Sequence, residues 1–419
     1  MTPVPNHRLV AERDTRRAEI GAPTQAIIVC PPGRSDPLRV LGGLTLIERQ
    51  LRQLWAVGIH EVLIVAPPSF IMPSAPLTHP LRMQVLASRL DSPWKMIHEF
   101  RHRLAERFLL LRGDLVVDQR LIEWLCGQSE DTLISRAESG PPELFGILDS
   151  LAVEELVEGT QKTLQQKPLG TFPTYWRERR GHVPLLLARV ESSDDAEVAW
   201  NALIDHVDKR TKDLPALLFD PPFENFLTRR LAPTRITPNQ VTAATTLLGF
   251  FVAWLFWNGW LFAGVLLAIT VEVLDGVDGK LARLKWQTSK VGELEHVLDF
   301  FYEMSWYVGL GRHFAVSGVG LAWPCAVAIC SADFLDQMAY LFFARRGGGN
   351  LDEGSALMRR FRVIGGRRNI YAWMMLPGIL LGIAATAFTA VAIWAVTTAV
   401  VHWFFAVTLP AEAHGNSPP

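Results

Sequence analysis

The stretch VLDGVDGKLAR, Val273 to Arg283, closes a long apolar run with two aspartates and decides the fold class of the second half of the chain. From Ile236 to Val271 there is no charged residue. Because a membrane helix needs about 20 apolar residues, this run is long enough for nearly two spans. Acids at membrane depth are costly, so Asp275 and Asp278 predict a functional site.

The bulk composition separates two halves of the 419-residue chain. A second run without charge extends from Asn369 to Ala411, whereas the first half has no comparable run and is predicted to be soluble. The net charge of -1 gives no electrostatic reason to expect nucleic acid as a partner. The four cysteines show neither metal-site spacing nor a disulfide framework, which is typical of a reducing cytoplasm. The polar N-terminus is unlike a signal peptide.

The first half reads as an α/β domain. QAIIVC (25–30) and EVLIVAP (61–67) are typical of buried strands, and RFLLLRGDLVVD (107–118) predicts another. TLIERQLRQLWAVG (45–58) has helical spacing, and DDAEVAWNALIDHVDKR (194–210) predicts a closing helix. This alternation predicts a parallel or mixed sheet covered by helices.

The second half is predicted to be an all-α domain of six transmembrane helices. We expect the spans at about 239–257, 260–282, 291–311, 315–343, 369–387 and 389–409. The whole chain then divides into a disordered tail at 1–24, the α/β domain at 25–212, a linker with an amphipathic juxtamembrane helix at 213–235, the membrane domain at 236–411 and a tail at 412–419.

Positive charge sets the expected orientation in the membrane. Arginines and lysines gather before the first span and in the loops after the second and fourth spans, whereas the opposite loops carry almost none, Arg312 excepted. Since positive loops stay inside, both termini and the soluble domain are expected in the cytoplasm, at the cell (inner) membrane.

Acidic side chains on two adjacent spans form the candidate metal site. Asp275 and Asp278 share one helix face, and the next helix brings Glu295, His296 and Asp299. Facing carboxylates make an oxygen-rich cage for two Mg²⁺ or Mn²⁺ ions, which would neutralise a pyrophosphate. The alternative is that the acids only pair with bases at the membrane edge, namely Lys280, Arg283 and Lys290.

The same stretch resembles the signature of the CDP-alcohol phosphotransferase family, D-x2-D-G-x2-A-R-x8-G-x3-D-x3-D. The matching residues are Asp275, Asp278, Gly279, Ala282, Arg283 and Gly292. TPNQVT (237–242), which contains Asn239, is similar to the family's first helix. The resemblance covers roughly residues 220–410. It implies that an alcohol or lipid acceptor displaces CMP from a CDP-linked donor in phospholipid biosynthesis, and it implies a homodimer.

The second half of the signature departs from the family. The third and fourth aspartates of the pattern fall on His296 and Phe300, and the acids stand one residue earlier, at Glu295 and Asp299. A shift of one residue turns a helical side chain by about 100°. Three accounts follow: a rotated helix with Glu295 as metal ligand and Asp299 as ligand and base, His296 as a ligand, or an inactive site.

The resemblance also implies substrate contacts. Arg283 would hold a phosphate of the CDP group, with Gly279, Ala282, Gly292 and Asn239 beside it. Arg367 and Arg368, which directly precede the fifth span, would bind a phosphate of the acceptor. The alternative for these two arginines is simple anchoring at the inner side of the membrane.

The α/β half is similar to nucleotidyltransferases of the sugar-nucleotide type, which implies a Rossmann-like fold. The stretch LRVLGGLTLIERQLRQLWAVGIHEVLIV (38–65) and the pair Gly113-Asp114 carry the resemblance. The phosphate loop PPGRSD (31–36) is short and contains prolines, and a lysine expected before the first stretch is missing. We therefore expect a domain that is inactive as a cytidylyltransferase; a bifunctional enzyme is the alternative.

Two other classes remain as alternatives. A non-catalytic membrane binding or scaffold protein would bind CDP-alcohols without turnover. A transporter would use the intramembrane acids for ion coupling, but the sequence shows no paired, interrupted helices in matching halves.

Overall fold

The computed structural model describes residues 22–33, 36–72, 80–138, 140–158, 164–176, 179, 181–287, 291–347 and 349–410, without the side chains of 158 and 291–296. These residues form two compact units. The first contains residues up to Thr174, Val183–Val207 and Leu284–Trp286; the second contains Tyr175–His182, Asp208–Arg283 and the residues from Gln287 onward.

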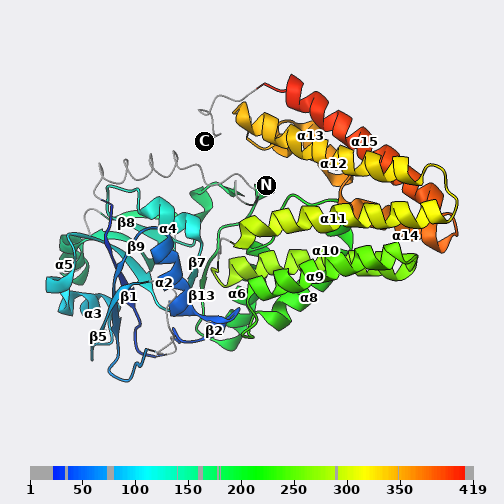
Figure 1. Cartoon of the computed structure of the whole chain (residues 1–419). Coiled ribbons are helices and arrows are strands. Elements are labelled where there is room, and N and C mark those ends of the chain that lie inside the picture. The colour runs from blue at the N-terminus through cyan, green and yellow to red at the C-terminus, as the bar shows by residue number, and fades with distance from the viewer. Residues whose placement is uncertain are drawn as a thin grey trace. The chain divides into compact units, whose positions relative to one another are not determined.

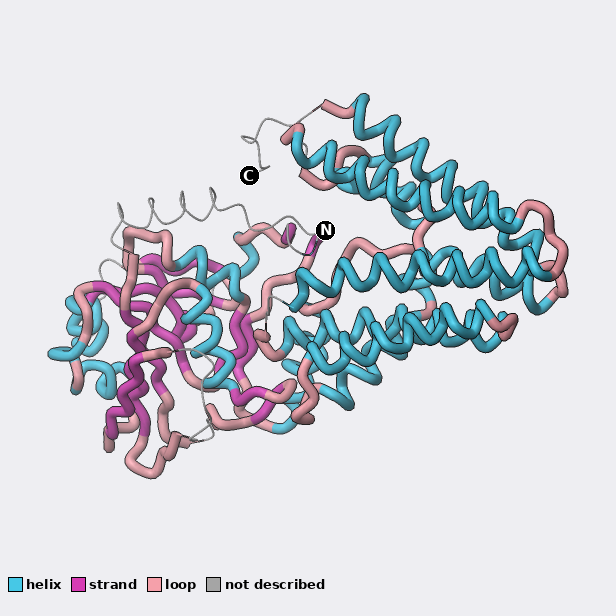
Figure 2. Tube along the Cα trace, viewed as in Figure 1, coloured by secondary structure: helices cyan, strands magenta, loops and turns pink. Residues whose placement is uncertain are grey.

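A seven-stranded sheet is the centre of the first unit (Figure 2). Its strand order is β10-β8-β9-β6-β1-β4-β5, and β9 runs antiparallel to both of its neighbours while the other pairings are parallel. The strands are β1 Gln25–Val29, β4 Glu61–Ala66, β5 Arg82–Ala87, β6 Arg107–Arg112, β8 Thr132–Ser135, β9 Pro142–Asp149 and β10 Gln165–Pro168. The expected mixed α/β sheet is confirmed.

Helices and small strand pairs complete this unit. The Thr45 hydroxyl accepts the Glu48 N–H and starts α2, which ends before Gly58 at φ +83°. Ser192 and Asp195 form a capping box that starts α6. The helices are α2 Leu46–Ala56, α3 Pro93–Glu99, α4 Gln119–Leu125, α5 Ser150–Glu158 and α6 Ser193–His206; β2 Val40–Leu41 pairs with β3 Leu44–Thr45, and β7 Leu115–Val117 with β13 Leu187–Arg189.

The second unit is helical, apart from a short pair of strands, β11 Tyr175–Trp176 and β12 Gly181–His182. Its long helices lie side by side (Figure 1), with α9 packed on α11 and α12 packed on α15. The helices are α7 Leu214–Leu218, α8 Asp220–Leu231, α9 Pro238–Trp257, α10 Leu261–Leu284, α11 Val291–Val316, α12 Ala322–Arg345, α13 Ala356–Ile364, α14 Arg368–Leu380 and α15 Ala384–Thr408. The expected all-α half is confirmed.

Three helices in the described part of the chain are long and apolar enough to cross a membrane: α9, α12 and α15. Helices also occupy the other three expected spans, but α10 and α11 carry acids. With 13 residues, α14 is about 20 Å long at 1.5 Å per residue, less than the bilayer core of about 30 Å. A turn with Gly382 at φ +72° ends it, so α15 begins at Ala384 and not near residue 389. The six-span count stays a prediction.

Candidate active site

Arg368, the first residue of α14, brings acids from two other helices together. Its Nη2 lies 3.1 Å from Oδ2 of Asp275 on α10, and its Nη1 lies 3.8 Å from Oδ2 of Asp299 on α11. Its Nε also pairs with Glu272 of α10. One guanidinium therefore sits between the carboxylates of two helices.

Helical spacing explains how α10 offers two acids to one arginine. Glu272 and Asp275 are three residues apart and so lie on one face of the helix. The Glu272 side chain is 10% exposed, whereas that of Asp275 is 34% exposed, so Asp275 is the accessible member of the pair. The sequence analysis missed Glu272, although its position one turn before Asp275 was a usable signal.

Asp278, also on α10, is contacted by a hydroxyl of α9. It is 4% exposed, and its Oδ2 accepts a hydrogen bond of 2.7 Å from the Thr242 hydroxyl of α9. The helix α9 begins where TPNQVT predicted it, with a capping box between Thr237 and Gln240 and with Pro238 in its first turn. This start places Thr242 on the face that contacts Asp278, a contact that the sequence did not reveal.

On α11, position 299 faces Arg368. The hydroxyl of Tyr302, one turn further on, accepts a hydrogen bond from Arg368, whose guanidinium carbon lies 5.2 Å from the Tyr302 ring centre. A Cβ at Gly249 of α9 would lie 2.7 Å from that ring, so the glycine makes room for Tyr302. Phe300 instead contacts the ring of Phe301. The carboxylate that faces inward is thus at Asp299, one residue before the signature position.

The other expected site residues on α10 and α9 are placed as follows. The side chain of Arg283 lies over Gly279, because a Cβ there would be 3.0 Å from Nη1 of Arg283. Ala282 is partly buried beside it, and Asn239 is exposed in the first turn of α9. The side chains of Glu295 and His296 lie outside the described part of the structure, and the contacts around Gly292 are not described either. The predictions for these three residues are therefore not tested.

The two adjacent arginines of the predicted acceptor site point to different partners. Arg367 Nη2 lies 3.6 Å from Oδ2 of Asp352 and 3.2 Å from the Tyr340 hydroxyl of α12. Arg368 instead forms ion pairs with described acids of α10 and α11. The sequence treated the two arginines as equivalent, but consecutive helical residues are turned by about 100° from each other.

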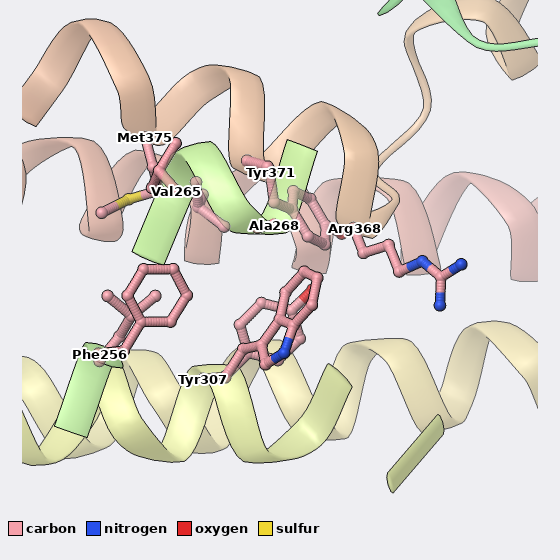
Figure 3. A pocket seen from close by; sticks show the side chains of 11 residues that line it. Phe256, Val265, Ala268, Tyr307, Arg368, Tyr371 and Met375 are labelled. Carbon is pink, nitrogen blue, oxygen red and sulfur yellow. The ribbon is translucent and has the colours of Figure 1, made fainter. Parts of the chain in front are cut away.

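Next to Arg368 the helices line a small, partly open pocket of about 20 Å³. Figure 3 shows the apolar and aromatic side chains around it, with the Arg368 guanidinium pointing away from them. A water molecule needs at least about 10–15 Å³, so this space holds about one water and no substrate. The lining residues are Phe256, Val265, Ala268, Trp306, Tyr307, Leu310, Arg368, Tyr371, Ala372, Met375 and Val391.

The acids have the donor chemistry for hard divalent cations. Asp275, Asp278 and Asp299 offer carboxylate oxygens, the ligands that Mg²⁺ and Mn²⁺ prefer. Among the described side chains no three His, Cys, Asp or Glu residues already lie close enough to hold an ion. Arg368 supplies compensating positive charge at Asp275 and Asp299.

In the first unit, the pair Gly113-Asp114 serves packing. Asp114 is fully buried, and its Oδ1 lies 2.8 Å from Nε of Arg112, which also pairs with Glu191 at 3.0 Å. A Cβ at Gly113 would lie 2.7 Å from Sγ of Cys30. Burial raises the pKa of the Cys30 thiol to about 12, and the Asp114 charge contributes, so this thiol stays neutral.

The comparison with known families identifies the kind of domain that forms the helical half. The CDP-alcohol phosphatidyltransferase model matches residues 235–410. This segment is a CDP-alcohol phosphatidyltransferase domain. The phosphatidyltransferase domain contains Asp275, Asp278 and Asp299 as well as Arg368. Together with the three apolar helices, it identifies the chain as a membrane protein.

A curated relative is similar over part of the chain. The bifunctional IPC transferase and DIPP synthase of Aquifex aeolicus is 30% identical over 160 residues, which are 38% of this chain and 36% of that relative. This chain thus matches little more than a third of the relative's own length.

Solved structures resemble each half with low scores. Phosphatidylinositol phosphate synthase of Mycobacterium tuberculosis, solved with CDP-DAG bound, is 19% identical with a TM-score of 0.36 and covers 48% of this chain and 99% of its own. A second structure of that synthase contains manganese and citrate. The 4-diphosphocytidyl-2C-methyl-D-erythritol synthase of Anaerococcus prevotii is 12% identical with a TM-score of 0.30 and covers 43% of this chain and 97% of its own.

Proposed function

We propose that this chain transfers a phospho-alcohol or phosphatidyl group from a CDP-linked donor to an alcohol or lipid acceptor and releases CMP. The observation that carries the proposal is the convergence of Asp275 and Asp299, from two helices of the phosphatidyltransferase domain, on Arg368. Acids and an arginine at one point suit a reaction in which a pyrophosphate is bound and broken.

Each side chain has a part in this reaction. Asp299 accepts the proton of the attacking hydroxyl as an O–P bond forms and the P–O bond to CMP breaks. Asp275, Asp278, Glu295 and Asp299 would hold Mg²⁺ or Mn²⁺, which supply positive charge for the pyrophosphate. His296 is the alternative ligand or base, and Arg283 binds a phosphate of the donor, with Gly279, Ala282 and Gly292 beside it.

Arg368 is proposed to bind a phosphate of the acceptor. It lies between Asp275 and Asp299 at the start of α14. Mg²⁺ or Mn²⁺ would supply positive charge at these acids, and the planar guanidinium of Arg368 would bind a phosphate of the acceptor through two hydrogen bonds. Arg367, paired with Asp352, anchors the helix start.

The α/β domain is proposed to be inactive as a cytidylyltransferase. The support is the ion pair of Arg112 with Asp114, which keeps this buried acid away from a ligand. The short phosphate loop at 31–36 adds to this, although Arg34 and Ser35 lie outside the described residues. The name of the Aquifex aeolicus relative keeps a bifunctional enzyme as the alternative.

The proposed location is the cell membrane, with six crossings and with both termini and the α/β domain in the cytoplasm. Helices α7 and α8 support an interfacial position, because they expose Leu218, Phe223 and Phe226 together with Arg229 and Arg230. A homodimer is proposed as well; cross-linking of the detergent-solubilised chain would test it.

The test is CMP release by the purified chain in detergent. CDP-diacylglycerol and CDP-inositol are each offered with a panel of alcohols and phospho-alcohols, with Mg²⁺ or Mn²⁺. We expect metal-dependent release that Asp278→Asn and Asp299→Asn both abolish, while Glu197→Gln, an exposed change on α6, leaves it intact. Loss in Asp278→Asn alone would move the base to Glu295 or His296. Binding of CDP-alcohols without release would favour the scaffold alternative.

A further inference from the structure

Four acids lie just before the matched domain and contact its helices. Asp208, Asp213, Asp220 and Glu224 precede residue 235, where the family match begins. We call this group the acidic strap. Each member lies close to a lysine, arginine or asparagine of α10, α13 or α14, or to Lys212 of its own segment.

The acidic strap contacts α10 within the signature stretch, at Lys280 and Gly276. Lys280 is 1% exposed, and its Nζ lies 2.7 Å from Oε2 of Glu224 and 3.3 Å from Oδ1 of Asp208. The same Nζ donates a hydrogen bond of 2.8 Å to Oδ1 of Asn225. One turn earlier, a Cβ at Gly276 would collide with the Glu224 carboxylate. Helix α10 therefore has a glycine and a buried lysine where α8 packs on it.

The strap also fixes the start of α14. Asn369, which is 4% exposed and directly follows Arg368, donates hydrogen bonds of 3.1 Å to Oδ1 of Asp213 and to Oδ2 of Asp220. Buried amides of this kind are nearly always hydrogen-bonded, and removing their partners leaves a polar group without compensation. The residue next to Arg368 is thus attached to the same segment as Lys280.

One short helix makes both attachments. Asp220, Glu224 and Thr228 recur every four residues on the buried face of α8, whereas Phe223 and Phe226 are exposed on the other side. Asp220 contacts α14 and Glu224 contacts α10, one turn apart. Because one turn of a helix is stiff, the spacing between these two contacts is fixed.

We propose that Asp220 and Glu224 are positioning residues that hold Asp275 of α10 against Arg368 of α14. The strap acts through its contacts with Lys280 and Asn369, which lie on the same helices as Asp275 and Arg368. The consequence for catalysis rests on the proposed function, whereas the placement of the two helices does not. A displacement of about 1 Å in a site of this kind costs about 100-fold in rate.

The experiment uses the full-length chain. It compares the wild type with Glu224→Gln, Asp220→Asn and the double variant Glu224→Gln/Lys280→Met. Glu197→Gln on α6 is the matched control. We expect each strap variant to lower kcat for CMP release by about 10- to 100-fold while KM for the CDP donor changes less than about 2-fold. The double variant removes the buried lysine charge together with its partner, so it regains thermal stability relative to Glu224→Gln but not kcat.

Hydrogen exchange of the backbone amides is a second measurement, and it does not depend on CMP release. Glu224→Gln is expected to speed exchange near 275–280, and Asp220→Asn near 369–372. Equal exchange in these segments, or a kcat that recovers with stability in the double variant, would overturn the positioning role. If the wild-type chain released no CMP, the proposed function would fail, and the exchange data alone would still decide whether the strap holds the helices.

Discussion

Asp278 accepts a 2.7 Å hydrogen bond from Thr242, which ties the second acid of the signature to the first turns of α9. The carboxylate is buried, and this hydrogen bond helps to orient it. A hydroxyl that orients a metal-binding carboxylate acts on the metal through it.

Thr242→Val keeps the side-chain shape and removes that donor. We expect the apparent affinity for Mn²⁺ to fall by about 10-fold or more, as is usual when the partner of a metal ligand is lost. The measurement is CMP release as a function of Mn²⁺ concentration. Thr245→Val, which removes a hydroxyl bonded only to the Val241 carbonyl of the same helix, should leave the Mn²⁺ dependence unchanged.

Arg368→Lys tests the guanidinium that spans the two acid-bearing helices. Lysine keeps the charge but cannot bridge Asp275 and Asp299 or offer a planar fork to a phosphate. We expect kcat/KM for the acceptor to fall by about 100-fold, equivalent to about 2.7 kcal/mol. Arg367→Lys is the control, because Arg367 pairs with Asp352. Equal losses in the two variants would contradict separate roles.

Asp220 should make stability depend on pH. Burial raises its pKa to about 6 from the usual 3.8; Asn369 opposes the rise, and Glu224 and Asp213 add to it. Between these values the folded chain binds more protons than the unfolded chain, so the free energy of unfolding falls as pH rises through this window. Asp220→Asn should therefore cost less stability at pH 7.5 than at pH 4.5, as thermal unfolding in detergent would measure. A constant difference would refute the assignment.

Asp114→Asn probes the α/β domain. The change leaves the partly buried Arg112 with Glu191 as its remaining acid, so we expect a loss of about 2–4 kcal/mol in stability of this domain. CMP release by the phosphatidyltransferase domain should not change at a temperature where the variant is folded. A selective loss of cytidylyltransfer in a sensitive assay would instead support the bifunctional alternative.

The sequence identified candidate site residues but not the side chains that contact them. Asp275, Asp278 and Arg283 stood out because their spacing matches a signature, and Asp299 because acids are rare in a membrane helix. Glu272 could have been found from its place one turn before Asp275. The contacts of Arg368 and Thr242 could not, because they depend on how helices far apart in the chain pack together.

Some elements of the fold were likewise predictable from the sequence, whereas some helix ends were not. Alternating strands and helices predicted the mixed sheet, and the stretch TPNQVT (237–242) predicted the start of α9. The ends of α14 were harder, because its apolar residues continue without a break into α15 and the separating turn depends on Gly382. Hydropathy alone cannot show where such a run bends.

The buried lysine of α10 also determines where this chain can be cut. A fragment that begins at the family boundary, residue 235, would keep the whole signature but lose Asp208, Glu224 and Asn225, the partners of Lys280. An ammonium group left in a dry interior is costly, so such a fragment should be hard to purify in folded form. A useful shortened protein should therefore begin before Asp208, well upstream of the region that similarity alone would select.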